Sequence, residues 1–422
     1  MLAAGALVGA STLAGTAQQP AMPPLVAVRP IDPPAVPLPP EAASSAETRF
    51  SFIAYGDTRS LVDGQALQPG HAAVVDAVTT RIKALASTPY PVRFVLQTGD
   101  AVVDGKNGRA WNVSFSPLVE RITRDAGTPY FLTAGNHDVA APGDLARPLG
   151  LQNLLSAFAR LIPPEGSPRR LSAYPTYAFG YGHAFVIAID SNIASDPLQL
   201  AWVTDQLERL DRTRYRHVIA FFHHPLFSSG PHGGVSSGPS APTTDDNVER
   251  ATAAMRALYA PLFRRFHVRL TLVGHDHLYD HWVERYTDAG VSYRRDDLVT
   301  GGGGAPTYIY RGEPEVRVYL AAGASQDVRL EHMMKPGMTP AENPNHCVVI
   351  RLDGSRLSLE VVGAGSTEYT SRGRPGPVGA ARSSSSSPAA TSLARCWRTA
   401  LWFSPSRSVR SPTLRGASDS TT

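Results

Sequence analysis

Apolar runs of strand length alternate with helical patterns between residues 51 and 273. The runs are rich in Val, Ile and Phe, and each stops close to a Gly, Asp or His, which is typical of buried strands. They span residues 51–55, 92–97, 130–133, 183–189, 217–222 and 268–273. Helical patterns lie between them, over residues 71–86, 111–125, 150–161, 197–210 and 247–265. Strands that alternate with helices in this way predict an α/β sheet.

More strand-like runs follow without long helices between them. They lie near residues 281–286, 306–310, 316–321, 346–352 and 356–362. Strands joined by short connections predict a second, mostly antiparallel sheet. The predicted fold class is therefore α/β, as a four-layer αββα sandwich with two facing mixed β-sheets and helices outside.

The two ends of the chain lack this pattern. Residues 1–19 hold a short apolar stretch and a Gly-Thr-Ala sequence at residues 15–17, which resembles a signal-peptide cleavage site. Residues 20–48 are rich in proline and predict a linker with no core of its own. Residues 49–365 contain the strands and helices, whereas the Arg- and Ser-rich residues 366–422 are expected to be disordered.

The N-terminal stretch predicts export of the protein. It is too short to span a bilayer, so no transmembrane anchor is expected. We therefore expect a secreted or periplasmic protein, and the alternative is a disordered leader rich in Ala and Gly.

Composition and charge narrow the functional classes. The chain has 422 residues, of which 42% are hydrophobic and 18% charged, as in a soluble globular protein. Its net charge of +4 arises from residues 372–422, which hold eight Arg and one acid, so the rest of the chain is slightly acidic. Nucleic-acid binding would rest on that tail alone, and we expect no specific nucleic-acid partner. The two cysteines, Cys347 and Cys396, are too few for a disulfide framework.

Five polar motifs follow predicted strands directly. Because ligands bind beyond the carboxyl ends of strands in open α/β sheets, we expect the motifs to converge on one sheet edge. The glycine that begins four of the five motifs would let the chain turn sharply there. The Asp, Asn and His side chains offer oxygen and imidazole donors, which suit Mn, Fe or Zn better than Ca. The motifs are Gly56-Asp57, Gly99-Asp100, Gly135-Asn136-His137-Asp138, His223-His224-Pro225 and Gly274-His275-Asp276-His277.

These motifs, in this order, resemble the calcineurin-like metallophosphoesterase superfamily. Within it, residues 298–310 (LVTGGGGAPTYIY) resemble the purple-acid-phosphatase-like branch. The likeness covers about residues 49–362. It implies a phosphoric ester hydrolase in which a hydroxide bridging two divalent metal ions attacks a phosphomonoester or phosphodiester. The implied partner is a small phosphate-ester substrate.

The resemblance also implies the metal ligands. Asp100 would bridge the two ions, and Asp57 and His277 would complete the first site. The second site would comprise Asn136, His223 and His275.

Catalytic and substrate-binding roles fall on four further residues. The resemblance implies that His137 contacts phosphate and protonates the leaving alkoxide, with Asp138 available to orient it. His232 lies on a glycine-rich loop that could fold over the metals, where it would contact phosphate or remain solvated. Arg59 could clamp a substrate phosphate or form a structural salt bridge. His224, beside His223, is expected to pack near the site without binding metal.

The sequence departs from the superfamily pattern at the first site. The superfamily usually has Asp-x-His, but here Arg59 follows Asp57-Thr58. Val103 stands where purple acid phosphatases supply a Tyr, so a coloured Fe(III) site is not expected. Either the first metal has fewer ligands or another residue, such as His71, replaces the imidazole. The alternative function is a phosphoesterase-fold binding protein with weakened catalysis.

Overall fold

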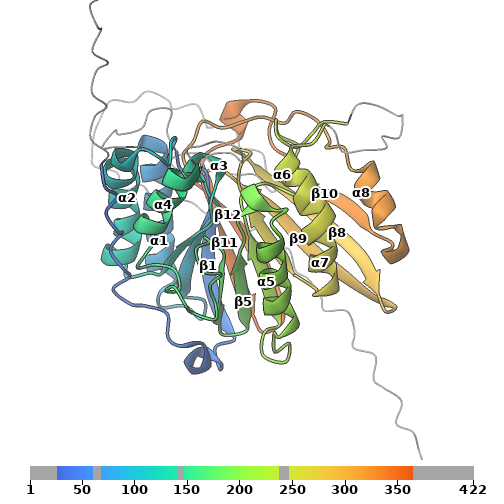
Figure 1. Cartoon of the computed structure of the whole chain (residues 1–422), viewed down its shortest axis with the longest axis horizontal. Coiled ribbons are helices and arrows are strands. Elements are labelled where there is room, and N and C mark those ends of the chain that lie inside the picture. Colours follow the sequence, from blue (N-terminus) through green and yellow to red (C-terminus); the bar gives the residue numbers. More distant parts are fainter. Residues whose placement is uncertain (1–25, 60–67, 140–146, 237–246, 365–422) are drawn as a thin grey trace, which may run out of the picture.

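Two mixed β-sheets lie face to face in the chain, with helices on the outer faces (Figure 1). The computed structural model describes residues 26–59, 68–139, 147–236 and 247–364. The sheets have five and seven strands, which confirms the predicted αββα architecture. The predicted signal sequence and C-terminal tail lie outside the described residues.

The five-stranded sheet has the order β12-β11-β1-β2-β3. Strands β1, β2 and β3 are parallel, and β11 joins β1 antiparallel. The bounds are β1 Arg49–Tyr55, β2 Val92–Gln97, β3 Tyr130–Leu132, β11 His346–Asp353 and β12 Arg356–Gly363.

The seven-stranded sheet has the order β10-β8-β9-β7-β6-β5-β4. Its central strands β5, β6, β7 and β9 are parallel, and β4, β8 and β10 are antiparallel to their neighbours. The bounds are β4 Tyr177–Tyr181, β5 Ala184–Ala188, β6 His217–Phe221, β7 Leu270–Val273, β8 Tyr279–Asp288, β9 Val291–Thr300 and β10 Arg329–Met334. All six of the first predicted strands exist, but they are divided between the two sheets.

The helices form two groups, with α1, α2 and α4 on one side of the sheets and α5, α6 and α7 on the other (Figure 1). The longer ones are α1 Pro69–Leu85, α4 Arg147–Ala157 and α5 Pro197–Glu208. The short ones are α2 Ser116–Glu120, α3 Asn136–Val139, α6 Arg250–Ala254, α7 Ala260–Arg265 and α8 Arg317–Ala322. None of the described helices combines the length and apolarity needed to cross a membrane.

Capping and proline residues explain where one helix begins and where two others follow π-helical turns. Asp196 caps α5 by accepting hydrogen bonds from the N–H groups of Leu198 and Gln199, both at 2.9 Å. Pro117 and Pro261 each follow a widened π-helical turn, at Ala110–Phe115 and Met255–Tyr259. Proline has no N–H, so the regular hydrogen-bond ladder cannot continue through it.

Two predictions for the second half of the chain are wrong. Residues 306–310 form no strand, and the predicted strand at 316–321 is replaced by helix α8, Arg317–Ala322. Short apolar runs fit either element, and the alanines at the end of this one favour a helix. Strand β9 was not predicted, because residues such as the buried Arg295 make its sequence polar. Arg295 is paired with Glu284 at 3.2 Å and Asp297 at 2.8 Å.

The described part of the proline-rich segment lies against the domain. Ile31 is fully buried in the main core, and its N–H donates to the Ala157 carbonyl at 2.9 Å. Glu41 accepts hydrogen bonds from Arg169 at 2.9 Å and from the Tyr215 hydroxyl at 2.7 Å. Residues 26–48 are therefore packed onto the body instead of forming a free linker.

Candidate metal centre

The five motifs meet where the carboxyl ends of strands from the two sheets lie next to each other. The motifs after β1, β2 and β3 come from one sheet, and those after β6 and β7 come from the other. A backbone contact ties the two sheets together here, since the N–H of Gly303, after β9, donates to the carbonyl of Gly56, after β1, at 2.7 Å. The predicted convergence is confirmed, although its edge belongs to two sheets instead of one.

The sharp turns are made by the ligand residues themselves. Asp57, Asp100 and His275 have φ values of 59°, 56° and 72°, in the left-handed region. Such a conformation costs a non-glycine residue about 1–3 kcal/mol. Gly99, before Asp100, shares this conformation with a φ of 98°, as the predicted sharp turn requires. Gly135 and Gly274 serve close approach instead, because a Cβ on Gly135 would collide with the Asp100 carboxylate and one on Gly274 with the Asp57 carboxylate. The predicted reason for these two glycines was therefore wrong.

Four atoms that could bind a metal ion converge in what we call the second half-site. It is made of Asn136, His223, His275 and the Oδ1 atom of Asp100. The Nε2 atom of His223 lies 2.9 Å from Asn136 Oδ1 and 3.3 Å from Asp100 Oδ1. It also lies 3.1 Å from Nδ1 of His275. Metal bonds of about 2.0–2.2 Å place neighbouring ligand atoms roughly 3 Å apart, so this spacing fits a bound cation.

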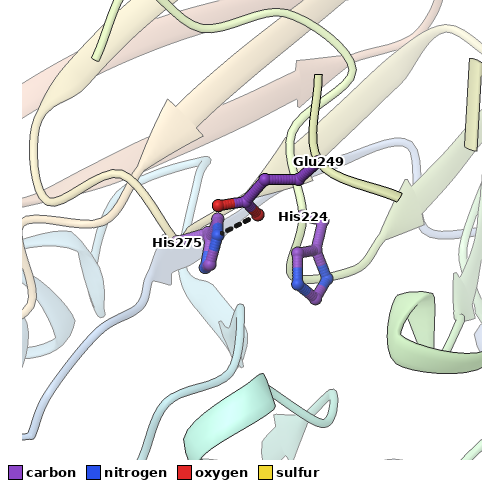
Figure 2. Close-up of side chains that lie close together, drawn as sticks. All are labelled: His224, Glu249 and His275. Atoms are coloured by element: carbon purple, nitrogen blue, oxygen red, sulfur yellow. Dashed lines mark hydrogen bonds and ion pairs between the residues drawn. The ribbon is translucent and has the colours of Figure 1, made fainter. Parts of the chain in front are cut away.

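Partners outside the half-site fix which nitrogen of each imidazole carries the proton. His223 donates through Nδ1 to the Thr98 carbonyl at 2.9 Å, which leaves a lone pair on Nε2. His275 faces the Glu249 carboxylate through Nε2 at 2.8 Å, which leaves its lone pair on Nδ1 (Figure 2). Both lone pairs therefore point into the half-site, as metal binding requires.

Burial and charge keep the second half-site ready for a cation. Burial lowers the pKa values of His223 and His275 to about 4, so both rings are neutral near pH 7. Burial alone would raise the pKa of Asp100, but nearby His223, His137 and Arg59 outweigh it and lower that pKa. Asp100 is therefore an ionised carboxylate beside neutral imidazoles.

The first half-site is made of Asp57, His277 and the Oδ2 atom of Asp100. His277 donates through Nδ1 to the Pro306 carbonyl at 2.8 Å, so its lone pair is on Nε2, 3.5 Å from Asp57 Oδ1. Arg59 lies among these ligands. Its Nε donates to Asp100 Oδ2 at 3.3 Å, and its Nη2 lies 3.4 Å from His277 Nε2.

Burial strongly disfavours a negative charge on Asp57. It raises the pKa of Asp57 well above its ordinary value, and the nearby Asp100 carboxylate raises it further. Arg59 partly offsets both effects by lowering that pKa. Its guanidinium therefore supplies positive charge at the half-site whose usual imidazole is missing.

Glu249 is a site residue that the sequence analysis missed. It precedes α6 and lies between two imidazoles, with Oε1 at 2.5 Å from His232 Nδ1 and Oε2 at 2.8 Å from His275 Nε2. With His224 and His275 it forms one of two groups of carboxylate and imidazole side chains close enough to hold a metal ion (Figure 2). The other group is Asp57, Asp100 and His277 of the first half-site. Its oxygens already accept from His232 and His275, so we assign it to orienting His275. No spacing or motif around Glu249 distinguishes it from other acids that precede helices.

His137 and Asp138 are held by separate hydrogen-bond partners, whereas the sequence predicted that one orients the other. His137 is held by the Val103 carbonyl, which accepts from Nδ1 at 2.7 Å. Asp138 is fully buried and accepts from the N–H groups of Asp100 and Ala101 at 2.9 and 2.8 Å. The prediction that Asp138 orients His137 is therefore wrong, because its carboxylate shapes the loop that carries Asp100.

Of the other predicted histidines, two lie at the centre and one lies away from it. His232 reaches it, with its ring 4.2 Å from that of His275. His224 packs beside the same ring at 4.5 Å and shares a 2.8 Å hydrogen bond with the Ser191 hydroxyl, as expected for a neighbour of the ligands. His71 instead stacks on Phe115 in the aromatic core at 5.6 Å, where the structure gives it no place among the ligands.

Comparisons with known proteins point to one family. The family model described as Calcineurin-like phosphoesterase matches residues 51–279, more than half of the chain. A phosphoenolpyruvate phosphatase from Allium cepa is 26% identical over 49% of this chain and 39% of its own length. Purple acid phosphatase 1 from Ipomoea batatas is 25% identical over 36% of this chain and 28% of its own length. The chain thus matches well under half the length of these relatives.

A solved structure shows the same fold. The purple acid phosphatase PPD1 from Lupinus luteus aligns with a TM-score of 0.51 at 16% identity. The alignment covers 75% of this chain and 51% of the lupin chain. Together with the family match, these findings confirm the resemblance seen in the motifs: the chain belongs to the calcineurin-like phosphoesterase family.

Proposed function

We propose that the chain hydrolyses phosphate esters with the help of a divalent metal ion at the second half-site. The observation that carries this proposal is the meeting of acceptor atoms on Asp100, Asn136, His223 and His275, the closest pair being 2.9 Å apart. Acceptors at such distances repel one another unless a cation lies between them. When bound, such an ion supplies positive charge to phosphate oxygens and makes water a nucleophile near neutral pH.

His137 is our candidate for protonating the leaving group. The Val103 carbonyl fixes its Nδ1 proton, so Nε2 is the atom that faces the centre, 3.9 Å from Asp100 Oδ2. A proton on Nε2 would pass to the alkoxide oxygen as the P–O bond breaks. The ring is about one-third exposed, which leaves it within reach of a substrate.

His232 is our candidate for contacting the phosphate. Burial would lower its pKa, but its hydrogen bond to Glu249 and the charge of Asp276 outweigh burial and raise it. The raised pKa favours an imidazolium beside the centre, which suits an anionic phosphate. The ring also lies 5.9 Å from that of Tyr308, so the two rings would line the same approach.

Substrate and metal identity follow from chemistry in outline. The substrate class is a phosphomonoester or a phosphodiester, because both expose anionic oxygens to the centre. The mixed oxygen and imidazole donors suit Mn, Fe or Zn. The family resemblance implies two such ions, one in each half-site.

We also propose that the protein is secreted or periplasmic. Support comes from the apolar stretch within residues 1–19 and the small residues at 15–17. The same segment predicts cleavage, so N-terminal sequencing of the mature protein from its own host checks this proposal. An intact N-terminus on protein from the cytoplasm would contradict it.

Metal-dependent turnover tests the proposed function. The full chain would be stripped with a chelator and assayed with an aryl phosphate and a bis-aryl phosphate, before and after adding Mn²⁺, Zn²⁺ or Fe²⁺. We expect hydrolysis of at least one ester only after metal is restored. Equal rates without metal would contradict the proposal. Metal binding with no hydrolysis of either ester would favour a binding protein.

A further inference from the structure

Arg59 is a positively charged side chain among the potential metal ligands of the first half-site. It follows β1 by a few residues and stands where the Asp-x-His pattern places an imidazole. Its side chain is 15% exposed, although it carries a full positive charge. Burial of a guanidinium is costly unless it is paired and hydrogen-bonded, so its partners indicate what the charge does.

Those partners are atoms of the first half-site. Arg59 donates from Nε to Asp100 Oδ2 at 3.3 Å. Its Nη2 faces His277 Nε2 at 3.4 Å. Because His277 gives its own proton to the Pro306 carbonyl at 2.8 Å, Nε2 has only a lone pair to offer. Nη2 must therefore be the donor, and the lone pair that would bind the first metal is already engaged.

The second half-site has no such cation among its ligands. Within the part of the chain that the structure describes, His223 Nε2 faces acceptors, with Asn136 Oδ1 at 2.9 Å and His275 Nδ1 at 3.1 Å. In the second half-site, acceptor atoms face one another directly. The other has acceptors around a charge that the chain supplies itself.

We infer that Arg59 takes the place of the first metal ion, so that the centre binds a single divalent ion at the second half-site. The inference rests on the proposed function and specifies its metal content. As arranged, the first half-site does not fit a second ion, because that ion would share Asp100 and His277 with a fixed guanidinium and be repelled by it. One metal ion and one arginine would then face a substrate phosphate where the family pattern has two metal ions, and a guanidinium can offer parallel N–H donors to phosphate oxygens.

Metal counting on the full chain tests the inference. The protein would be equilibrated with excess Mn²⁺, desalted and measured for manganese by mass spectrometry, with electron paramagnetic resonance on the same sample. Mn²⁺ is chosen because surface histidines bind it weakly. We expect about one ion per chain and the spectrum of an isolated Mn²⁺.

The variant Arg59→His sharpens the test because it restores the Asp-x-His pattern. We expect it to hold about two ions per chain and to show an exchange-coupled pair. Arg49→His is the matched control, since Arg49 begins the same strand and pairs with Asp353 at 2.9 Å, away from the centre. It should stay at one ion. Circular dichroism would establish that both variants fold.

Each outcome decides something. Two ions in the unaltered chain would overturn the inference and leave the proposed function standing. One ion in both the unaltered chain and Arg59→His would show that Arg59 is not what excludes the second ion, which also overturns it. No bound metal in the unaltered chain would overturn the proposed function itself.

Discussion

The two half-sites share one carboxylate, Asp100, yet they are prepared differently. In the second half-site, outer partners hold His223 and His275 so that their lone pairs face each other across 3.1 Å. In the first half-site, the lone pair of His277 faces the Arg59 guanidinium at 3.4 Å. Both half-sites bring the expected donor types together, but only the second leaves its donors available to a metal.

A ligand motif establishes which metal-binding atoms are present, whereas the residues around those atoms decide what they can bind. The motif around His277 is intact in sequence, and Pro306 even sets the tautomer that metal binding needs. A single substitution at position 59 supplies a competing cation. Changes to the second half-site should therefore affect turnover and metal affinity most.

Removing a ligand of the second half-site should have the largest effect. Asn136→Ala should lower turnover by about 1000-fold, because about 4 kcal/mol of metal-derived stabilisation is lost with the ion. Its thermal unfolding should change little, since Asn136 is only partly buried. Asn107→Ala, at an exposed position outside the centre, is the matched control. Full turnover in Asn136→Ala would refute our assignment of the second half-site.

The next effect concerns the leaving group. His137→Ala should slow hydrolysis of alkyl phosphates by about 100-fold, because their alkoxides need a proton as the bond breaks. Aryl phosphates should lose less than about 10-fold, since a phenolate leaves more readily unprotonated. Steady-state kinetics on an alkyl and an aryl ester checks this. Equal losses on both would rule out proton donation by His137.

Glu249 should matter through His275 and not through chemistry. Glu249→Ala should weaken Mn²⁺ affinity by about 10- to 100-fold, which is typical when the partner that orients a metal-binding His is removed. Glu249→Gln keeps an acceptor oxygen and should recover part of that affinity. Titration calorimetry measures both. An unchanged affinity in Glu249→Ala would mean that the carboxylate does not prepare the second half-site.

The smallest effect should come from a histidine–carboxylate pair outside both half-sites. His332 lies 2.5 Å from Asp280, whose other oxygen accepts from the Ser229 N–H at 2.8 Å, in the loop that leads to His232. Burial would lower the pKa of His332, but Asp280 and Glu313 outweigh burial and raise it. The pair should therefore stabilise the fold fully below the unfolded pKa of about 6.5 and lose that contribution as pH rises through the folded pKa.

Thermal unfolding between about pH 5 and about pH 9 checks this sign. The metal-free chain should exceed His332→Asn in stability by about 1 kcal/mol at the acidic end, and the gap should shrink as pH rises. A gap that grows with pH would show that His332 is held as a neutral ring.

Much of the fold was readable from periodicity. The runs at residues 51–55, 92–97 and 217–222 became β1, β2 and β6, because fully buried strands read as continuous apolar segments. The division of strands between two sheets was not readable, since pairing depends on contacts distant in sequence. Strand β9 was missed for a different reason: its polar residues include Arg295, which is buried and paired not only with nearby Asp297 but also with Glu284 of β8, which only the pairing of strands brings beside it.

The centre was predictable for the residues that motifs carry and not for the groups that orient them. Spacing placed Asp57, Asp100 and His275 together because each follows a strand. The Val103 carbonyl that holds His137 and the Glu249 carboxylate that holds His275 carry no motif. Arg59 was recognised as a departure, but its contacts with Asp100 and His277 depend on where β1, β2 and β7 end relative to one another.

One measurement tests the contrast between the half-sites most directly. A crystal of the full chain grown with Mn²⁺ would be measured for anomalous scattering of manganese. We predict one strong peak bounded by Asn136, His223 and His275, with Arg59 still bonded to Asp100. A peak of equal height between Asp57 and His277, or no peak at the second half-site, would contradict the account.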